Sequence, residues 1–201
     1  VGPDAEMWID ANVVAVPELA ANPRVNLDEL ARRWIAEHLE CTDAATVAAI
    51  HAALTHSTTT ALEMFYIGPF AAGRPDPWYP SGNFIQDDLI DAEAAWRIVQ
   101  RLGDAALDEA VAEKQRAVER LARDRRAIQQ TAGSLGERVG QTLIHQMEYA
   151  EALAETLSDL VAALVAYRRG QRKRDGTHAR AAVDAAHHCQ SHWNHHQRFA
   201  N

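Results

Sequence analysis

Apolar residues recur at helical spacing along most of the chain, which predicts an all-α protein. One clear stripe joins Leu27, Leu30 and Trp34, and Asn26 precedes it as a side chain suited to cap a helix. Thr42 is expected to cap the next helix. Its inner face is expected to carry Val47, Ile50, Leu54, Ala61 and Phe65.

Two long helices are predicted in the second half of the chain. The first, over 104–130, has a seam spaced like a coiled-coil heptad, in which Lys114 and Arg125 interrupt the apolar positions. We expect both side chains to lay their stems on the core and carry their charges into water. The second helix, over 137–169, is expected to end at Gly170 and to face the core with Leu143, Met147, Ala150, Leu157, Leu164 and Tyr167.

Helix-breaking and helix-capping residues set the boundaries of the remaining segments. Pro17 is expected to kink or split a helix over 4–21, because proline removes a backbone donor. Residues 68–82 hold four of the seven prolines and three of the ten glycines, and so predict one long loop. Helices are expected to resume at Asp87-Asp88 and again at about Thr177. Long helices joined by short turns predict a multi-helix, largely antiparallel bundle, forming a single all-helical domain over 1–201.

Composition and charge narrow the classes of function. With 20 Lys+Arg and 28 Asp+Glu the net charge is −8, whereas a protein that tracks nucleic-acid phosphates needs a basic face. No apolar stretch approaches the ~20 residues that span a bilayer. Two distant cysteines, Cys41 and Cys189, give neither a disulfide framework nor a thiolate metal site. We therefore expect a soluble protein, favouring the cytoplasm, with no nucleic-acid or membrane partner.

The long loop offers one candidate binding feature. Trp78 and Tyr79 lie between prolines, and aromatic side chains on a stiffened loop suit stacking on a sugar ring or anchoring at a protein interface. The alternative is a plug that covers the end of the bundle. Ordered loops often carry function, so Trp78 and Tyr79 are the candidate substrate-binding residues.

The histidine-rich C-terminal helix is a weaker candidate for a metal site. His188, His192 and His196 follow one another at spacings of four residues, and imidazole pairs at this spacing can chelate Zn²⁺, Cu²⁺ or Ni²⁺. One helix supplies at most two well-placed ligands, however, so an exposed polar helix is the favoured interpretation. We predict no metal and no cofactor, and the chain contains no phosphate-binding glycine motif and no nucleophile motif.

The first forty residues resemble a known family. Ala11-Asn12, Leu19-Ala20 and Asn22-Pro23, followed by Leu27, Glu29-Leu30-Ala31 and Trp34-Ile35, are similar to the opening of the C-terminal helical domain of α-glucuronidases of glycoside hydrolase family 67. Val13 and Val14 stand where the family prefers aromatic residues, and Ala21 stands where it has tryptophan. A looser similarity continues through Ser57, Tyr66-Ile67, Trp78, Pro80 and Asp87-Asp88.

The resemblance implies a place in a larger enzyme. The family removes glucuronic acid, or its 4-O-methyl ether, from xylan with carboxylates on a (β/α)₈ barrel, against which the helical domain packs and often dimerises. A barrel needs about 250 residues, so none is present here. The chain is therefore expected to be a C-terminal, non-catalytic fragment whose partners are the parent barrel, carbohydrate and a second copy in a homodimer. The alternative is a stand-alone helical bundle that binds a protein or a ligand without catalysis.

Overall fold

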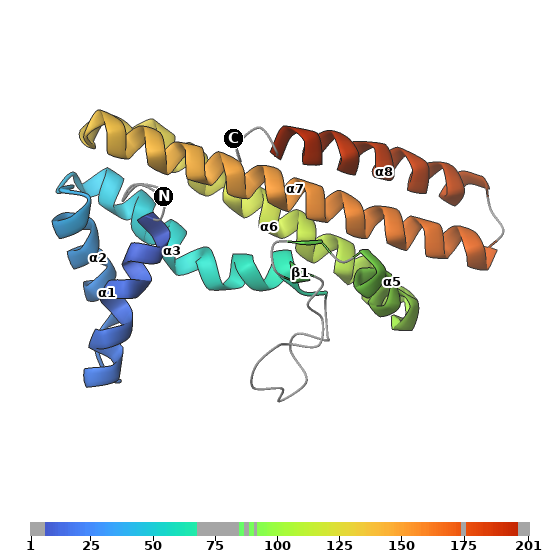
Figure 1. The fold of residues 1–201 in the computed structure, drawn as a ribbon, viewed down its shortest axis with the longest axis horizontal. Coiled ribbons are helices and arrows are strands. Elements are labelled where there is room, and N and C mark those ends of the chain that lie inside the picture. The colour runs from blue at the N-terminus through green and yellow to red at the C-terminus, as the bar shows by residue number, and fades with distance from the viewer. Residues whose placement is uncertain (1–6, 68–84, 87–88, 91, 174–175, 197–201) are drawn as a thin grey trace. The chain divides into compact units, whose positions relative to one another are not determined.

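The computed structural model describes residues 7–67, 85–86, 89–90, 92–173 and 176–196 (Figure 1). The fold is an all-α helical bundle, as predicted. In chain order the elements are α1 (Met7–Ala21), α2 (Leu27–His38), α3 (Ala44–Phe65), β1 (Ile85–Gln86), β2 (Leu89–Ile90), α5 (Ala92–Arg101), α6 (Asp104–Thr131), the 3₁₀ turn η1 (Ala132–Ser134), α7 (Glu137–Lys173) and α8 (Gly176–His196).

The chain forms two compact units. The first unit contains residues 1–57 and 121–148, and the second contains residues 58–120 and 149–201. Helices α3, α6 and α7 each contribute residues to both units. The prediction of a single domain over 1–201 stays a prediction. Among the described residues, no helix is long and apolar enough to cross a membrane.

In the first unit, side-chain caps set where two helices begin. The Asn26 side chain accepts hydrogen bonds from the backbone N–H groups of Asp28 and Glu29, so the predicted cap of α2 is confirmed. Helix α3 is capped by Asp43 and not by Thr42, because the Asp43 carboxylate accepts from both the backbone N–H and the hydroxyl of Thr46. These hydrogen bonds also lower the pKa of Asp43.

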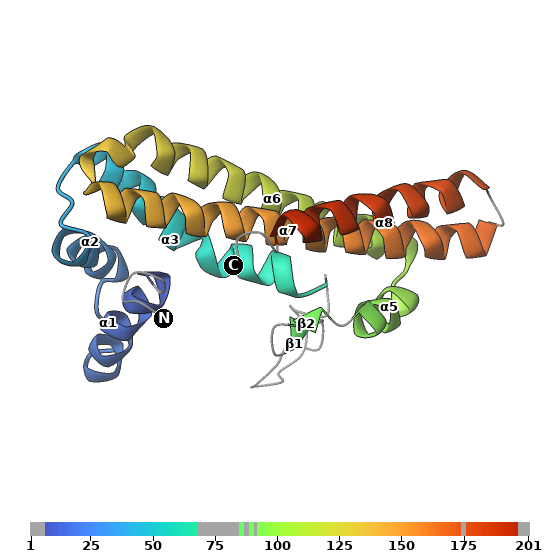
Figure 2. The same ribbon diagram turned by 45° about the horizontal axis from the view of Figure 1, so that its top comes forward.

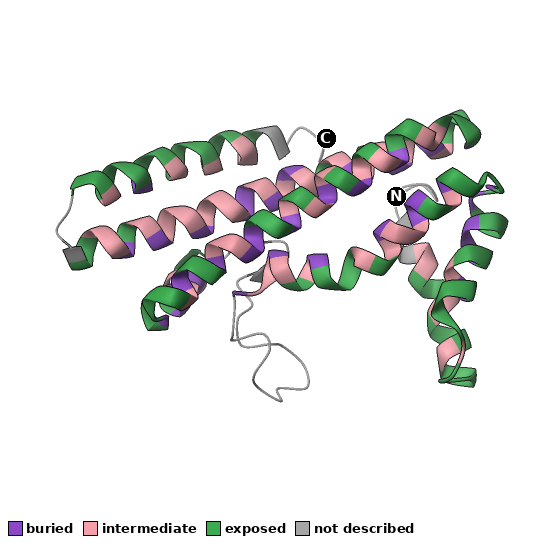
Figure 3. Ribbon diagram, turned by 180° about the vertical axis from the view of Figure 1, so that it is seen from behind, coloured by how far each residue is buried: buried purple, intermediate pink, exposed green. Residues whose placement is uncertain are grey.

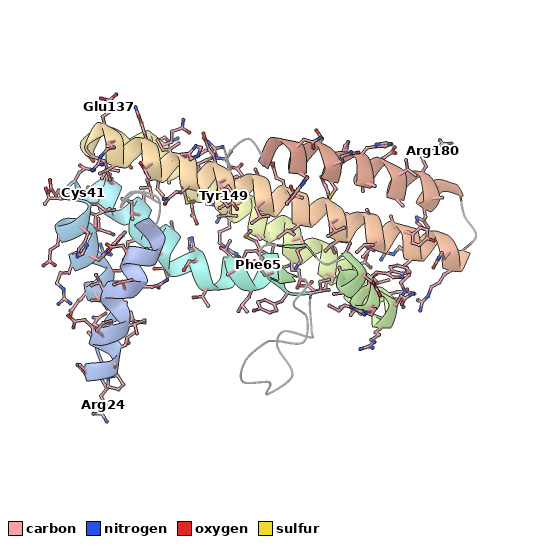
Figure 4. The ribbon with its side chains drawn as sticks, in the orientation of Figure 1. Arg24, Cys41, Phe65, Glu137, Tyr149 and Arg180 are labelled. Carbon is pink, nitrogen blue, oxygen red and sulfur yellow. The ribbon has the colours of Figure 1, made fainter. Side chains whose placement is uncertain are left out.

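The core of the first unit is largely apolar and includes a polar junction around Thr46. Thr46 is fully buried, and its hydroxyl oxygen lies 2.9 Å from the carbonyl oxygen of Thr131 and 2.6 Å from the Ser134 hydroxyl. This junction joins the start of α3 to η1, so a buried hydroxyl is satisfied between two elements. Figure 4 labels Cys41, a buried free thiol at this end of α3. The surrounding core consists of Leu30, Trp34, Ile35, Leu39, Ile50, Ala53, Leu121, Ile128, Leu135, Leu143 and Met147.

The second unit departs from the predicted helix at 87–88. Strands β1 and β2 pair antiparallel, with Ile85 opposite Ile90 and Gln86 opposite Leu89, and α5 begins only at Ala92. The helix expected to resume at Asp87-Asp88 therefore starts later, because Leu89 and Ile90 pair with β1 before the chain turns helical. Asp87 and Asp88 themselves lie outside the described residues.

Lys114 contradicts the expectation that its charge reaches water. The side chain is buried, and its ammonium donates to the backbone carbonyls of Glu63 and Tyr66 and to the Glu113 carboxylate. The two carbonyls come from the end of α3, where helices leave acceptors without intrahelical partners. Lys114 is therefore held inside by the α3 C-terminus, and burial lowers its pKa despite the charge of Glu113.

Helix α8 lies along α7 in both views (Figures 1 and 2). Gly170 does not end α7, which continues to Lys173. A Cβ atom at Gly170 would lie 3.4 Å from the backbone nitrogen of Ala179 on α8. Gly170 therefore lies inside α7, at a point where α8 comes within van der Waals distance.

Helix α1 is not split at Pro17, because proline removes one donor and the neighbouring residues still close the helix. The expectation that Tyr167 faces the core was wrong. Tyr167 on α7 is half exposed, and it contacts Trp96 of α5 with ring centroids 5.4 Å apart. The buried positions of this part of α7 are instead Val161, Val165 and Arg168.

Candidate functional site

Helices α1 and α2 form a hairpin that contains the whole stretch resembling the glycoside hydrolase domain. Asn22 builds the turn: its N–H donates to the Glu18 carbonyl at 2.8 Å, and its side chain accepts from the N–H of Arg24 at 3.1 Å. Figure 4 shows Arg24 at this turn, between the two helices. The spacing from Asn12 through Pro23 to Trp34 therefore corresponds to one helix, one turn and the middle of the next helix.

Two polar links hold α1 against α2. The Asp10 carboxylate accepts a hydrogen bond from the buried indole N–H of Trp34 at 2.9 Å and lies 2.9 Å from Nδ1 of His38. One turn before the end of α1, Glu18 pairs with Arg33 at 2.7 Å. Asp10 and Glu18 are the two charged residues of α1, and both are used toward α2.

Over its described side chains, at positions 10–21, helix α1 exposes apolar residues. None of the α1 side chains described, at positions 10–21, is buried (Figure 3). Val13 is 62% exposed, Val16 is 63% exposed and Leu27, at the start of α2, is 57% exposed. We call Val13, Val16 and Leu27 the α1 apolar face. Single exposed apolar residues are normal, whereas an apolar helix with no buried position indicates a contact surface.

Sequence reasoning did not find the α1 apolar face. The segment was recognised as an apolar helix, and such helices are usually buried in a core. The sequence does contain one indication of this face: both charged residues of α1, Asp10 and Glu18, point to the same side. That side can be identified only once the partners Trp34, His38 and Arg33 are known.

A second candidate feature is an open groove in the second unit, with a volume of about 490 Å³. His192 of α8 lies at this groove, with Nδ1 2.8 Å from the Asp159 carboxylate and Nε2 4.0 Å from that of Glu155. The lining therefore carries three carboxylates and one imidazole, which favours a cationic or hydrogen-bonding occupant. The residues are Gln115, Val118, Glu119, Glu155, Ser158, Asp159 and His192.

The histidines of α8 do not converge within the described part of the chain. His188 is exposed, whereas His192 is directed to the carboxylates of α7, and the side chain of His196 lies outside the described residues. No group of three or more His, Cys, Asp or Glu side chains described here is placed to hold a metal ion. His188 and His192 differ in exposure because α7 covers the position of His192 and leaves that of His188 open to solvent.

Cys189 lies beside this groove but is a poor nucleophile. Its thiol donates to the Thr156 carbonyl at 3.4 Å. Burial, together with the negative charge of Asp159, raises the pKa of the thiol. The neutral thiol therefore predominates at neutral pH.

The two residues proposed for carbohydrate binding, Trp78 and Tyr79, lie outside the described residues. Their role stays a prediction. In comparisons with known proteins, the chain matches no family model, no curated protein sequence and no solved structure. Function must therefore be inferred from the residues and their arrangement.

Proposed function

We propose that the chain is a helical accessory domain of an α-glucuronidase-like glycoside hydrolase that acts on glucuronic-acid-decorated xylan. In this proposal the α1 apolar face packs on the catalytic barrel, which lies outside the 201 residues. The observation that carries the proposal is the uncovered surface of α1, with Val13 and Val16 more than 60% exposed.

The position of this surface supports the proposal. The residues that resemble the family and the residues that build the α1 apolar face belong to the same helical hairpin. Burying each exposed valine against a partner would contribute on the order of 1.5 kcal/mol by removing apolar area from water. Because Asp10 and Glu18 are held toward α2, a partner would not have to desolvate an unpaired charge on α1.

The remaining roles follow from the same proposal. The chain supplies no catalytic residues, so the carboxylates that cleave the glycosidic bond belong to the barrel. Trp78 and Tyr79 contribute an aromatic surface toward the carbohydrate. A long helix also serves as a homodimer interface, for which the half-exposed Tyr149 and Tyr167 of α7 offer contact area.

Replacing the two valines should abolish docking without unfolding the chain. We expect Val13→Asp/Val16→Asp to reduce binding to an α-glucuronidase barrel, expressed without its own helical domain, by at least about 100-fold, because two carboxylates would be desolvated. Both positions are exposed, so the unfolding temperature should change by no more than about 2 °C. Calorimetric titration and thermal unfolding measure the two effects.

A charge-matched control is available on α8. Ala186→Asp/Gln190→Asp adds two carboxylates at exposed positions of the second unit and should bind the barrel as the wild type does. Equal binding by the valine variant and the wild type would remove α1 from the interface. No binding by the wild type would contradict docking on such a barrel.

A stand-alone ligand-binding bundle is the second candidate, and the groove at His192 favours it. Three carboxylates line this groove, and Nδ1 of His192 lies 2.8 Å from one of them, on Asp159. The two candidates differ in the barrel experiment, because a stand-alone bundle does not bind the barrel. They also differ in the gene, since only the first requires codons for alternating strands and helices beside those of this chain.

A further inference from the structure

Among the described residues, no group accepts a hydrogen bond from Nη1 of Arg168 on α7. The residue is 5% exposed, and its Nη1 is inaccessible to solvent. Leaving a buried charged donor unsatisfied costs several kcal/mol on the scale of measured desolvation penalties. Such a group in a folded protein calls for an explanation, and one explanation is that Arg168 binds an anion.

The neighbouring carboxylates are already engaged by other arginines. Asp104 pairs with Arg172 at 3.1 Å, and Asp108 pairs with Arg169 at 2.6 Å. Burial lowers the pKa of the Arg168 guanidinium, the charge of Arg172 lowers it further, and Asp104 only partly opposes them. Positive charge is therefore in excess around Arg168.

The start of α6 lies at the same place. Asp104 is the first residue of α6, and its carboxylate acts on both Arg168 and Arg172. The first turn of a helix leaves backbone N–H groups without intrahelical acceptors and carries the positive end of the helix dipole. The N-terminus of a long helix such as α6, with 28 residues, favours a bound anion. The buried Arg168, whose Nη1 meets no acceptor among the described residues, adds an independent donor.

We propose that Arg168, Arg172 and the first turn of α6 form a binding site for an oxyanion, either a phosphate or a carboxylate group of a small molecule. The guanidinium of Arg168 supplies the buried donor, because its planar fork can bond two oxygens of one anion. The side chain of Asp104 is 79% exposed, so it can turn into solvent when the anion takes its place beside Arg172. This site does not depend on the proposed glycosidase function.

Thermal unfolding and calorimetric titration with inorganic phosphate test the site, with acetate as the carboxylate probe and chloride at matched ionic strength as the reference. We expect one of the two anions to bind saturably and to raise the unfolding temperature of the wild type by about 5 °C or more near 100 times its Kd. Which anion binds distinguishes a phosphate ligand from a carboxylate ligand.

Three variants make the test specific. Arg168→Met should lose the shift and, without added anion, should unfold at or above the wild-type temperature, because an unpaired buried charge has been removed. Arg168→Lys should weaken binding at least about tenfold, since one ammonium cannot replace the fork. Arg169→Met, which removes the neighbouring arginine paired with Asp108, should keep the shift.

Three results would overturn the proposal. An equal shift in the wild type and Arg168→Met, or no saturable shift with either anion, would show an adventitious ion only. A large loss of stability in Arg168→Met without anion would show that Arg168 has a structural partner within the protein.

Discussion

Replacing Lys114 by methionine should destabilise the second unit by about 3–5 kcal/mol, the range found when one partner of a buried ion pair is removed. The ammonium satisfies three acceptors at once: the carbonyls of Glu63 and Tyr66 and the carboxylate of Glu113. Methionine fills the volume but leaves all three acceptors without this donor. Chemical unfolding monitored by circular dichroism gives the free-energy difference.

The pH dependence of the unfolding free energy is a second measurable difference between the wild type and Lys114→Met. Burial lowers the pKa of Lys114 in the folded state below the ordinary value of 10.5, so the unfolded chain binds this proton more tightly. Stability from this residue therefore rises as the pH increases from the folded pKa toward 10.5. The wild type should gain stability relative to Lys114→Met as the pH rises from the folded pKa of Lys114 to 10.5, and should show no such gain below the folded pKa.

Two further variants separate the lysine from its surroundings. Gln115→Met changes the next, exposed residue and should alter stability by less than about 0.5 kcal/mol. Adding Glu113→Gln to Lys114→Met should recover part of the loss, because the carboxylate no longer remains charged and buried. A loss below about 1 kcal/mol for Lys114→Met would contradict the buried position of the ammonium.

Glu63→Gln should be the next most damaging change, at about 2–3 kcal/mol, because it weakens two charge-assisted hydrogen bonds between α3 and α6. The Glu63 carboxylate accepts from Arg116 at 2.8 Å and from Arg120 at 2.7 Å, and its side chain is 16% exposed. Glu109→Gln is the matched control. It removes an exposed partner of Arg116 and should cost no more than about 1 kcal/mol.

The same carboxylate should contribute to acid unfolding. Burial opposes ionisation of Glu63, but the hydrogen bonds from Arg116 and Arg120 outweigh it and lower its pKa below 4.5. Its contribution is therefore fully present above pH 4.5 and is lost as the pH falls through the folded pKa. The difference in unfolding free energy between the wild type and Glu63→Gln should be constant at neutral pH and shrink below pH 4.5. A difference that grows on acidification would contradict this assignment.

Much of the helical architecture could be predicted because local signals carry it. Asn26 caps α2 through bonds to residues two and three positions away, and the periodicity of α6 and α7 extends over many turns. Failures occurred where distant residues decide the outcome. Lys114 stays buried because the end of α3 supplies acceptors about fifty positions away.

The candidate sites were harder to predict than the fold. His192 was recognised as a possible ligand on a polar helix, but its pairing with Asp159 depends on how α8 rests on α7. Arg168 was not singled out at all, since its burial and its unpartnered Nη1 are properties of packing. The α1 apolar face required knowledge of which side of α1 meets α2.

The two proposed sites belong to different units, so each can be tested by variants that leave the other unchanged. The α1 apolar face lies in the first unit, and Arg168 lies in the second. Loss of barrel binding in Val13→Asp/Val16→Asp should leave the anion-dependent shift unchanged, because the arginine site is built from residues of the second unit alone. Conversely, Arg168→Met should leave barrel binding unchanged.

Glucuronic acid release from aldouronic acids tests the central claim most directly. The measurement compares the 201-residue chain with the complete product of the gene that encodes it. Under the proposed function we expect release by the complete product and none by the chain alone, because the proposal assigns the catalytic carboxylates to the barrel. Release by the chain alone, or no release by the complete product, would contradict the account.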